Sequence, residues 1–407
     1  MTMLGRRHAA LLPVLVFLFL SQGTLKTWAE DSAPLEQRQA EESPAANADL
    51  DPVTKLLIWI QQNEGQVDLE VGAVNEEGLR GTKAMRDMQQ YQVAVKLKKY
   101  MAVPLAEWNK STEENTLVLL KKRFNEPEWD KVMEPYWGSL PQRGEVITKE
   151  LFPPAKLGLL QDPSMAAFVR VHQDFARNVL RGAKPHVVKD VRAMLGRDIS
   201  LEEFKYWASL VASYAFTFPD DTNPEKQVRV MLPLIDMINH ANIDEANLKL
   251  FQDENGDYIA YTTRAVKKGE ELRHTYHVTC ERNDHTLFHY GFVQDLPEPK
   301  LAAQDLPSGN LYVESAHSEA DYEVGGPLAT EEELQRLKDI LAAFPTTEAE
   351  DERLLTGGGW MDKLLGRKPL TDDVERLFVK YRMLRKKALR LTIERLRANL
   401  ASSSAEL

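Results

Sequence analysis

The sequence predicts an α+β fold: a small irregular β core with a helical insert, followed by an all-α domain. Three observations lead to this prediction. Short apolar stretches that alternate with polar residues occur before about residue 105 and return near residue 232. Helical periodicity occupies most of the segment between them. After residue 296, Pro-containing loops lead into a long amphipathic segment.

The composition is that of an ordinary globular protein. The chain has 407 residues, of which 43% are hydrophobic, so it can form two domains or one large one. Its 62 acidic and 51 basic residues give a net charge of -11, which disfavours nucleic acid as a partner. Cys280 is the single cysteine, so no internal disulfide can form and the fold depends on packing.

The first 50 residues have the layout of a targeting segment. Basic residues precede the apolar run LLPVLVFLFL, and a polar stretch ends at Ala29, which predicts a signal peptide over residues 1–29. The run is shorter than the roughly 20 residues of a spanning helix, so we expect no stable membrane insertion unless the leader stays uncleaved. Residues 30–50 read as a disordered acidic linker. Export through the secretory pathway is the prediction, with a bipartite plastid leader as the alternative.

Folded structure is expected to begin at DPVTKLLIWIQQNEG. Asp51 can cap a helix there, Pro52 suits its first position, and Gly65 marks its end. The following stretch GTKAMRDMQQYQVAVKLKKYMAVPL predicts strands and turns, because Val93, Val95 and Leu97 alternate with smaller or polar residues.

The helical insert is predicted over about residues 105–225. Ser200 and Glu203 have the spacing of a capping box, followed by apolar residues at helical spacing. Strands then return, and Asn255-Gly256 predicts a hairpin turn between LKLFQ and YIAYTT. Together with the preceding elements, these strands form a core domain predicted over residues 51–295.

A helical domain is predicted over residues 296–407. Its last helix opens at Thr371 and has an apolar face that runs from Val374 to Leu391. The basic residues of this helix lie mostly off that face, and we interpret them as a solvated surface. They are Lys380, Arg382, Lys386, Lys387 and Arg390.

The sequence lacks the motifs of several common kinds of binding and catalytic site. Gly72, Gly78 and Gly81 do not make GxGxxG, and neither a Walker motif nor a GxSxG elbow occurs. The segment HTYHVTCERNDHTLFH has spacings that resemble a small zinc module. Alternation along a strand would place its first two histidines on opposite faces, however, so no metal is expected. The candidate ligands are His274, His277, Cys280, His285 and His289.

The stretch LPLIDMINHA places three polar side chains, Asp236, Asn239 and His240, inside an apolar run. Buried polar groups are costly unless backbone, another side chain or a ligand satisfies them. These three either cap a buried turn or bind a ligand.

Several motifs follow one another in a fixed order: LLIWIQQNEG, EEGLRGTKAMRDM, FKYWASLVASYAF, LPLIDMINHA, KKGEELRHTYH and RNDHTLFHYGFV, then FPTTEAEDERLL and KYRMLRKKALRL. In this order they resemble SET-domain protein methyltransferases of the Rubisco large-subunit lysine methyltransferase type, over about Leu56 to Leu396. The resemblance implies an irregular β SET core and an all-α C-terminal substrate-binding domain.

The resemblance also implies a cofactor, S-adenosyl-L-methionine, and a set of site residues. Tyr276 matches the tyrosine beside the reacting methyl group, and Tyr290 and Phe292 match the substrate channel. For Phe292, plain core packing is an equally good interpretation. The implied cofactor-binding residues are Glu77, Gly78, Leu79, Ser213, Asp236, Asn239, His240 and Tyr276.

Two departures from the family pattern concern cofactor affinity. Tyr214 stands where an arginine commonly pairs with the cofactor carboxylate, unless Arg80 or Arg229 substitutes. One extra residue also lies between Tyr276 and Asn283.

The implied activity is methyl transfer to a lysine side chain of a protein substrate. Such a site needs oxygen or aromatic lining for the sulfonium and a neutral amine opposite it. Tyrosine provides that lining, and its phenol stays neutral. The alternatives are a catalytically weakened SET-like interaction module, suggested by Tyr214 and the leader, and a histidine N-methyltransferase.

Overall fold

The computed structural model describes residues 50–76, 78–220, 223–276, 282–295, 324–358, 366 and 368–405. The expected signal peptide and all but the last residue of the linker lie outside this part, so they stay predictions. Glu77, His277 and Cys280 also lie outside it. Among the described residues, no helix combines the length and apolar character needed to cross a membrane.

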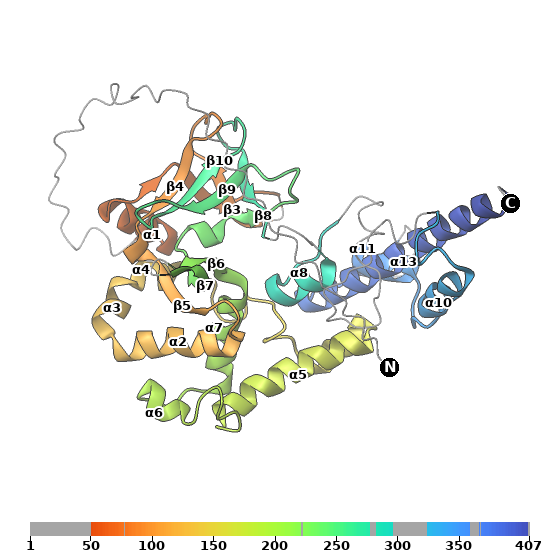
Figure 1. Cartoon of the computed structure of the whole chain (residues 1–407), viewed down its shortest axis with the longest axis horizontal. Coiled ribbons are helices and arrows are strands. Elements are labelled where there is room, and N and C mark those ends of the chain that lie inside the picture. The colour runs from red at the N-terminus through yellow and green to blue at the C-terminus, as the bar shows by residue number, and fades with distance from the viewer. Residues whose placement is uncertain are drawn as a thin grey trace, which may run out of the picture. The chain divides into compact units, whose positions relative to one another are not determined.

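The predicted α+β class is confirmed: short strands form three small sheets, and helices precede, interrupt and follow these strands along the chain (Figure 1). The first sheet has the order β1 (Gln66–Val67), β4 (Val93–Leu97), β10 (Tyr258–Thr262) and β9 (Leu248–Gln252). The second has the order β2 (Leu69–Ala73), β3 (Arg80–Ala84), β11 (Glu271–His274) and β8 (Asn239–His240). The third has the order β5 (Val103–Glu107), β7 (Asn223–Met231) and β6 (Ala215–Asp220).

The helices fall into three groups along the chain. One helix precedes the sheets, α1 (Pro52–Gln62). The insert between β5 and β6 contains α2 (Thr112–Asn125), α3 (Pro127–Val132), α4 (Glu134–Ser139), α5 (Pro163–Leu180), α6 (Val191–Leu195) and α7 (Leu201–Tyr214). The C-terminal side has α8 (Asn283–Tyr290), α10 (Glu331–Ala342), α11 (Glu348–Thr356) and α13 (Asp373–Ala405). Short 3-10 helices are η1 (Lys99–Met101), η2 (Pro154–Leu160) and η3 (Ile235–Met237).

The start of α1 confirms the expected cap. A carboxylate oxygen of Asp51 accepts hydrogen bonds from the backbone N–H groups of Val53 at 3.0 Å and Thr54 at 3.1 Å. These are two of the donors that a helix leaves unsatisfied at its N-terminus. Leu56 and Ile60 are fully buried, so the apolar face of the helix lies against the core.

The capping box predicted for α7 forms only in part. The Ser200 hydroxyl accepts from the backbone N–H of Glu203 at 3.0 Å. The Glu203 carboxylate does not return to Ser200 but lies 3.5 Å from Arg197, because this nearby guanidinium competes for it. A complete box occurs instead at α2, between Ser111 and Glu114.

The hairpin predicted at Asn255-Gly256 is confirmed. Strands β9 and β10 pair antiparallel, with Tyr258 opposite Gln252. Gly256 has a φ of 81°, a left-handed conformation that glycine adopts without a steric penalty.

The interpretation of the basic residues on α13 as a solvated surface is wrong for two of them. Arg382 and Lys386 are 3% and 1% exposed. Both pair with the fully buried carboxylate of Asp351 on α11, at 2.7 Å and 2.5 Å. A shared counter-ion from another helix allows these cations to be buried, and the α13 sequence alone contains no sign of it.

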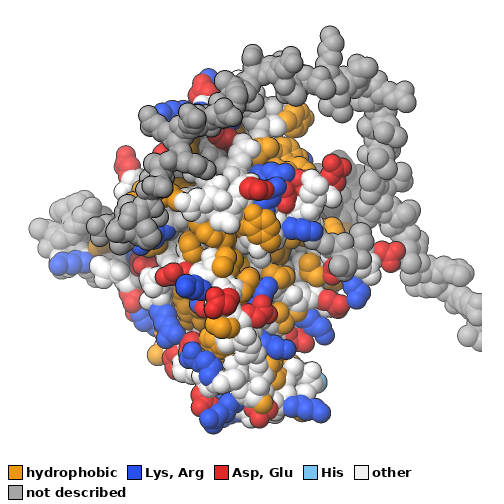
Figure 2. All heavy atoms as spheres, turned by 90° about the vertical axis from the view of Figure 1, so that its left-hand side faces the viewer, with side chains coloured by type: hydrophobic (Ala, Val, Ile, Leu, Met, Phe, Trp, Pro, Cys, Tyr) orange, Lys and Arg blue, Asp and Glu red, His pale blue; other side chains and the backbone are white. Residues whose placement is uncertain are grey.

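The surface of the chain mixes charges of both signs. On the face shown in Figure 2, acidic and basic side chains are interspersed among areas of hydrophobic surface. The net charge of -11 is therefore not concentrated in one acidic patch on this face.

Candidate active site

The apolar part of LPLIDMINHA anchors the segment in the core. Leu232, Leu234, Ile235 and Ile238 are all 0% exposed. Leu234 has a φ of 72°, a left-handed conformation that is strained for a non-glycine residue and costs on the order of 1–3 kcal/mol. Burial of its side chain offsets this cost. The sharp turn leads directly into η3, which carries Asp236.

Asp236 is a buried carboxyl group with one partner. Its Oδ2 accepts a hydrogen bond from the phenol of Tyr136 on α4 at 2.5 Å. Its Oδ1 is buried and has no hydrogen-bond partner among the described residues. Burial raises the pKa of Asp236 to about 8, against the lowering effect of the Tyr136 hydrogen bond. The group is therefore mostly protonated near neutral pH.

Asn239 connects two strands of the second sheet. Its side-chain N–H groups donate to the backbone carbonyl of Arg80 and to Oε1 of Glu271, both at 3.0 Å. A Cβ at Gly81 would lie 2.4 Å from the amide nitrogen of Asn239, so this close approach requires glycine. The Asn239 side chain thus helps to hold strands β3, β8 and β11 of the sheet together.

His240 positions the segment that follows β11. Strands β8 and β11 pair in parallel, with His240 opposite His274. Nδ1 of His240 accepts a hydrogen bond from the backbone N–H of Tyr276 at 3.1 Å. The two rings also lie 5.1 Å apart. The imidazole therefore holds the backbone of Tyr276 at a defined place beside β8.

A hydrogen bond to the backbone of another segment orients the phenol of Tyr276. It donates to the backbone carbonyl of Ile238 at 3.0 Å, and its ring centroid lies 4.7 Å from that of Tyr290. Burial, with the nearby Tyr214 and Tyr290, raises the pKa of Tyr276, so its phenol stays neutral. Because the proton points toward Ile238, the oxygen lone pairs remain available to a ligand.

Tyr290 is the last residue of α8. Gly291 follows with a φ of 72°, and a Cβ there would meet the Ile147 carbonyl oxygen at 1.7 Å, so the turn that ends α8 requires glycine. The hydroxyl of Ser213 on α7 donates to the backbone carbonyl of His289 at 2.7 Å. This bond ties the helix that enters the site to α8.

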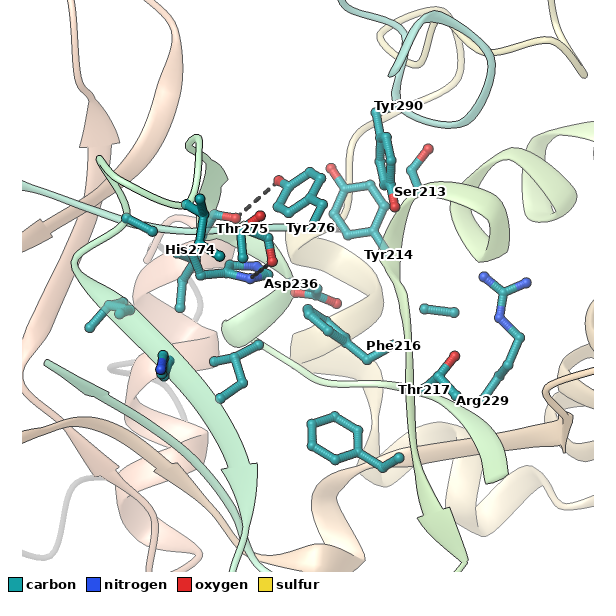
Figure 3. A pocket seen from close by; sticks show the side chains of 18 of the residues that line it. Ser213, Tyr214, Phe216, Thr217, Arg229, Asp236, His274, Thr275, Tyr276 and Tyr290 are labelled. Carbon is teal, nitrogen blue, oxygen red and sulfur yellow. Dashed lines mark hydrogen bonds between the residues drawn. The ribbon is translucent and has the colours of Figure 1, made fainter. Parts of the chain in front are cut away.

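These groups surround a cavity of about 870 Å³ (Figure 3). Ser213, Tyr214, Asp236, Tyr276 and Tyr290 line it, and Figure 3 shows Asp236 and the tyrosine rings gathered in one part of it. The size is within the range of small-molecule sites. Residues from α7, η3, α8 and the segment after β11 therefore meet at one place.

Comparisons with known proteins decide the fold. A solved structure of Rubisco LSMT bound to AdoMet superposes with a TM-score of 0.58 at 17% identity, covering 87% of this chain and 93% of that one. The SET domain of LSMT bound to lysine and AdoHcy gives 0.57 at 17% identity, covering 85% and 91%. A complex of Rubisco LSMT with sinefungin and monomethyllysine gives 0.56 at 17% identity, covering 85% and 92%.

This chain has the SET-domain fold of Rubisco LSMT. No family model matches the sequence. The N-lysine methyltransferase setd6 of Salmo salar is 27% identical over 129 residues, which are 30% of this chain. The match spans 28% of the length of that relative.

The SET fold places the expected site residues in two groups. Ser213, Asp236, Tyr276 and Tyr290 line the cavity. Its lining residues do not include Gly78 and Leu79 at the β2–β3 turn, Asn239 and His240 on β8, or Phe292 after α8. His240 still contacts the cavity residue Tyr276, and Asn239 directly follows the cavity residue Ile238 in the sequence.

Phe292 packs behind the cavity. Its ring lies 5.9 Å from His240 and 6.2 Å from Tyr290. It therefore packs near two residues of the site and is not among the residues that line the cavity, and its role in a substrate channel stays a prediction.

His274, one of the candidate metal ligands, is a buried residue of the cavity lining. It is 5% exposed, and burial lowers its pKa to about 4, so its imidazole is neutral. Its Nδ1 lies 3.0 Å from the carbonyl of Thr275. The ring packs 4.9 Å from Tyr276 and forms part of the cavity lining.

Sequence reasoning missed Tyr136 and Phe216. Tyr136 lies 100 residues before its partner Asp236, and nothing in EPYWGS marks it as a site residue. Phe216 lies only three positions after Ser213 in FKYWASLVASYAF, so its place in a motif already singled out could have indicated it.

Proposed function

We propose that this chain is an S-adenosylmethionine-dependent protein-lysine N-methyltransferase. The observation that carries the proposal is the neutral phenol of Tyr276, oriented by Ile238 and adjoined by Tyr290, within a cavity of about 870 Å³. Two further findings support it. Structures with the same fold were solved with AdoMet, AdoHcy, lysine and monomethyllysine. The curated relative is named as an N-lysine methyltransferase.

The residues present suit the proposed cofactor. Asp236 keeps a buried Oδ1 without a partner in the described chain, which a ligand hydrogen bond would satisfy. The rings of Tyr276 and Tyr290 provide the aromatic and oxygen lining that a sulfonium favours. Around Gly78 the backbone is open, because a Cβ there would meet nothing within 4 Å. When bound, S-adenosylmethionine supplies an electrophilic methyl group.

The residues proposed to hold the cofactor come from five segments. They are Gly78 and Leu79 after β2, Ser213 on α7, Asp236 in η3, Asn239 and His240 on β8, and Tyr276 after β11. Glu77 belongs to the same proposal but lies outside the described residues.

Tyr276 orients the reactants in this proposal. Its oxygen can accept weak C–H contacts, because its own proton is donated to Ile238. The neighbouring phenol of Tyr290 is neutral as well, since burial raises its pKa to about 12. Neither phenol is a strong base at neutral pH, so their role is alignment.

The cavity lining favours a neutral lysine amine. The rings of Tyr214, Phe216 and Tyr290 surround the space, and a lysine that enters loses hydration, which lowers its pKa. Asp236 is mostly protonated near neutral pH and therefore does not hold the amine as an ammonium ion. The same desolvation frees the lone pair that attacks the methyl group.

The experiment is a calorimetric titration of the full chain with S-adenosylmethionine, followed by radiolabelled methyl transfer to protein extracts. We expect binding, and label that is lost in Tyr276→Phe. Amino-acid analysis of the product separates methyl-lysine from methyl-histidine. A folded chain that neither binds the cofactor nor transfers label would contradict the proposal and favour an interaction module, which the loss of the family arginine at Tyr214 also suggests.

A further inference from the structure

One cation of the cavity, Arg229, has no counter-ion among the residues that the structure describes. Arg229 lies on β7 opposite Thr217 of β6, is half-buried and lines the cavity. Within the described chain it makes no hydrogen bond or ion pair through its side chain. In Figure 3 its guanidinium lies on the side of the cavity away from Tyr276 and points toward Ser213 and Tyr290.

Stability of the fold does not explain this arrangement. Burial lowers the pKa of Arg229. A partly desolvated cation without a partner destabilises a fold. Two other buried arginines of the described chain have carboxylates: Arg382 pairs with Asp351, and Arg385 pairs with Asp162. The surroundings of Arg229 are therefore those expected of a residue that binds an anionic ligand.

The cavity is positive although the chain is acidic. Lys249, an exposed residue of β9, is a second cation in its lining. Asp236 is the one carboxyl group among the described residues of that lining, and burial raises its pKa to about 8. Near neutral pH the lining therefore carries positive charge, in a chain whose net charge is -11. A concave site of this kind concentrates anionic groups.

The location favours an anion of the acceptor over one of the cofactor. Of the proposed cofactor residues, Ser213, Asp236 and Tyr276 line this cavity, whereas Gly78, Asn239 and His240 do not. Tyr290, which belongs to the proposed acceptor channel, also lines it, and the guanidinium of Arg229 points toward Tyr290 and lies away from Tyr276 (Figure 3).

We propose that Arg229 binds the carboxylate of an aspartate or glutamate located close to the target lysine in the protein substrate. This inference rests on the proposed function and specifies its substrate class as lysines in acidic segments. The positive lining also has a chemical consequence. It disfavours the ammonium form of the entering lysine, while the flanking carboxylate offsets the repulsion of the segment as a whole.

The test compares peptides that differ by one charge. Each peptide has a single lysine in a neutral background, with Glu, Gln or Arg placed in turn at each flanking position. Binding to the full chain loaded with S-adenosylhomocysteine is measured by fluorescence anisotropy. We expect at least one position where Glu binds roughly tenfold more tightly than Gln, an effect that salt weakens.

Variants of Arg229 assign the preference to this residue. We expect Arg229→Gln to bind Glu and Gln peptides equally, and Arg229→Glu to prefer the Arg peptide. Arg192→Gln is the matched control, because Arg192 is 75% exposed on α6 and pairs only at the surface with Asp198. It should keep the wild-type preference.

The possible results distinguish a failure of the Arg229 inference from a failure of the proposed function. Equal binding of Glu and Gln peptides by the wild-type chain overturns the inference alone, and this holds even if the variants do not fold. A Glu preference that persists in Arg229→Gln, together with weaker S-adenosylmethionine binding, assigns Arg229 to the cofactor carboxylate and also overturns it. A chain that binds no S-adenosylmethionine and labels no peptide contradicts the proposed function, and the inference falls with it.

Discussion

The backbone N–H of Tyr276 donates a hydrogen bond to Nδ1 of His240 at 3.1 Å, and this bond links the two ends of the candidate site. The residues are 36 positions apart in the sequence. Parallel pairing of β8 with β11 brings them together, with Arg273 opposite Asn239 and His274 opposite His240. The position of the Tyr276 phenol therefore depends on an imidazole from another strand.

Replacing His240 by Ala removes that acceptor. We expect a loss of about 1–2 kcal/mol in the free energy of unfolding, since a buried N–H is left without a partner. Methyl transfer should fall roughly 100-fold because the phenol loses its defined position. Urea unfolding and radiolabel assays measure the two effects. Wild-type activity in the variant would show that Tyr276 is held by other contacts.

Replacing Tyr276 by Phe removes the phenol oxygen and keeps the ring. Transfer of radiolabel should fall about 100-fold, while cofactor affinity measured by calorimetry changes little, because alignment is what the oxygen contributes. The unfolding free energy should fall by about 1 kcal/mol with the loss of the bond to Ile238. Tyr91→Phe is the matched control, since Tyr91 is 71% exposed. Equal activity of the two variants would exclude a catalytic role for Tyr276.

The raised pKa of Asp236 leads us to expect that the stability of the fold depends on pH. Its folded pKa of about 8 lies above the unfolded value of 3.8, so the folded state binds the extra proton between these values. Stability from this group is therefore complete at low pH and is lost as the pH rises toward about 8. His274 acts in the opposite direction below 6.5, because its folded pKa is lowered to about 4.

The Asp236 effect is thus isolated between pH 6.5 and about 8 by comparison with Asp236→Asn. Over this range the wild-type chain should lose on the order of 1–2 kcal/mol relative to the variant. Denaturant unfolding at several pH values measures the difference. Parallel pH profiles of the two proteins would mean that Asp236 is ionised in the folded state.

Two glycines of the β2–β3 hairpin should respond differently to alanine. A Cβ at Gly81 would lie 2.4 Å from the Asn239 amide and 2.8 Å from Val74, whereas one at Gly72 meets nothing within 4 Å. We expect Gly81→Ala to cost about 1–3 kcal/mol and to weaken cofactor binding by displacing Asn239. Gly72→Ala, the matched control, should change neither. Thermal unfolding measures the stability of each variant, and calorimetry measures its cofactor binding. Equal stability and equal binding in the two variants would rule out the close approach at Gly81.

Asp351 should be the most sensitive carboxylate of the C-terminal helices. Replacement by Asn leaves the buried cations Arg382 and Lys386 uncompensated, which costs about 3–5 kcal/mol. The control is Glu394→Gln, because the Arg390–Glu394 pair is exposed and such pairs contribute about 1 kcal/mol or less. Denaturant unfolding measures the free energy of unfolding of both variants. A small effect of Asp351→Asn would indicate that the cations reach solvent.

The sequence by itself determined the features that depend on neighbouring residues. Asp51 and Pro52 specify the start of α1, and Asn255-Gly256 specifies the β9–β10 hairpin, because caps and turns form within a few positions. The order of the LPLIDMINHA and YGFV motifs indicated the SET fold, which the structural comparison confirmed.

Only the tertiary structure decided which side chains share an environment. It brought Tyr136 to Asp236 across 100 positions, buried Arg382 and Lys386 against Asp351, and left Arg229 in the cavity without a carboxylate in the described chain. Burial and charge pairing depend on segments far apart in the sequence. A residue's local pattern therefore cannot reveal whether its charge will meet a partner, solvent or an open cavity.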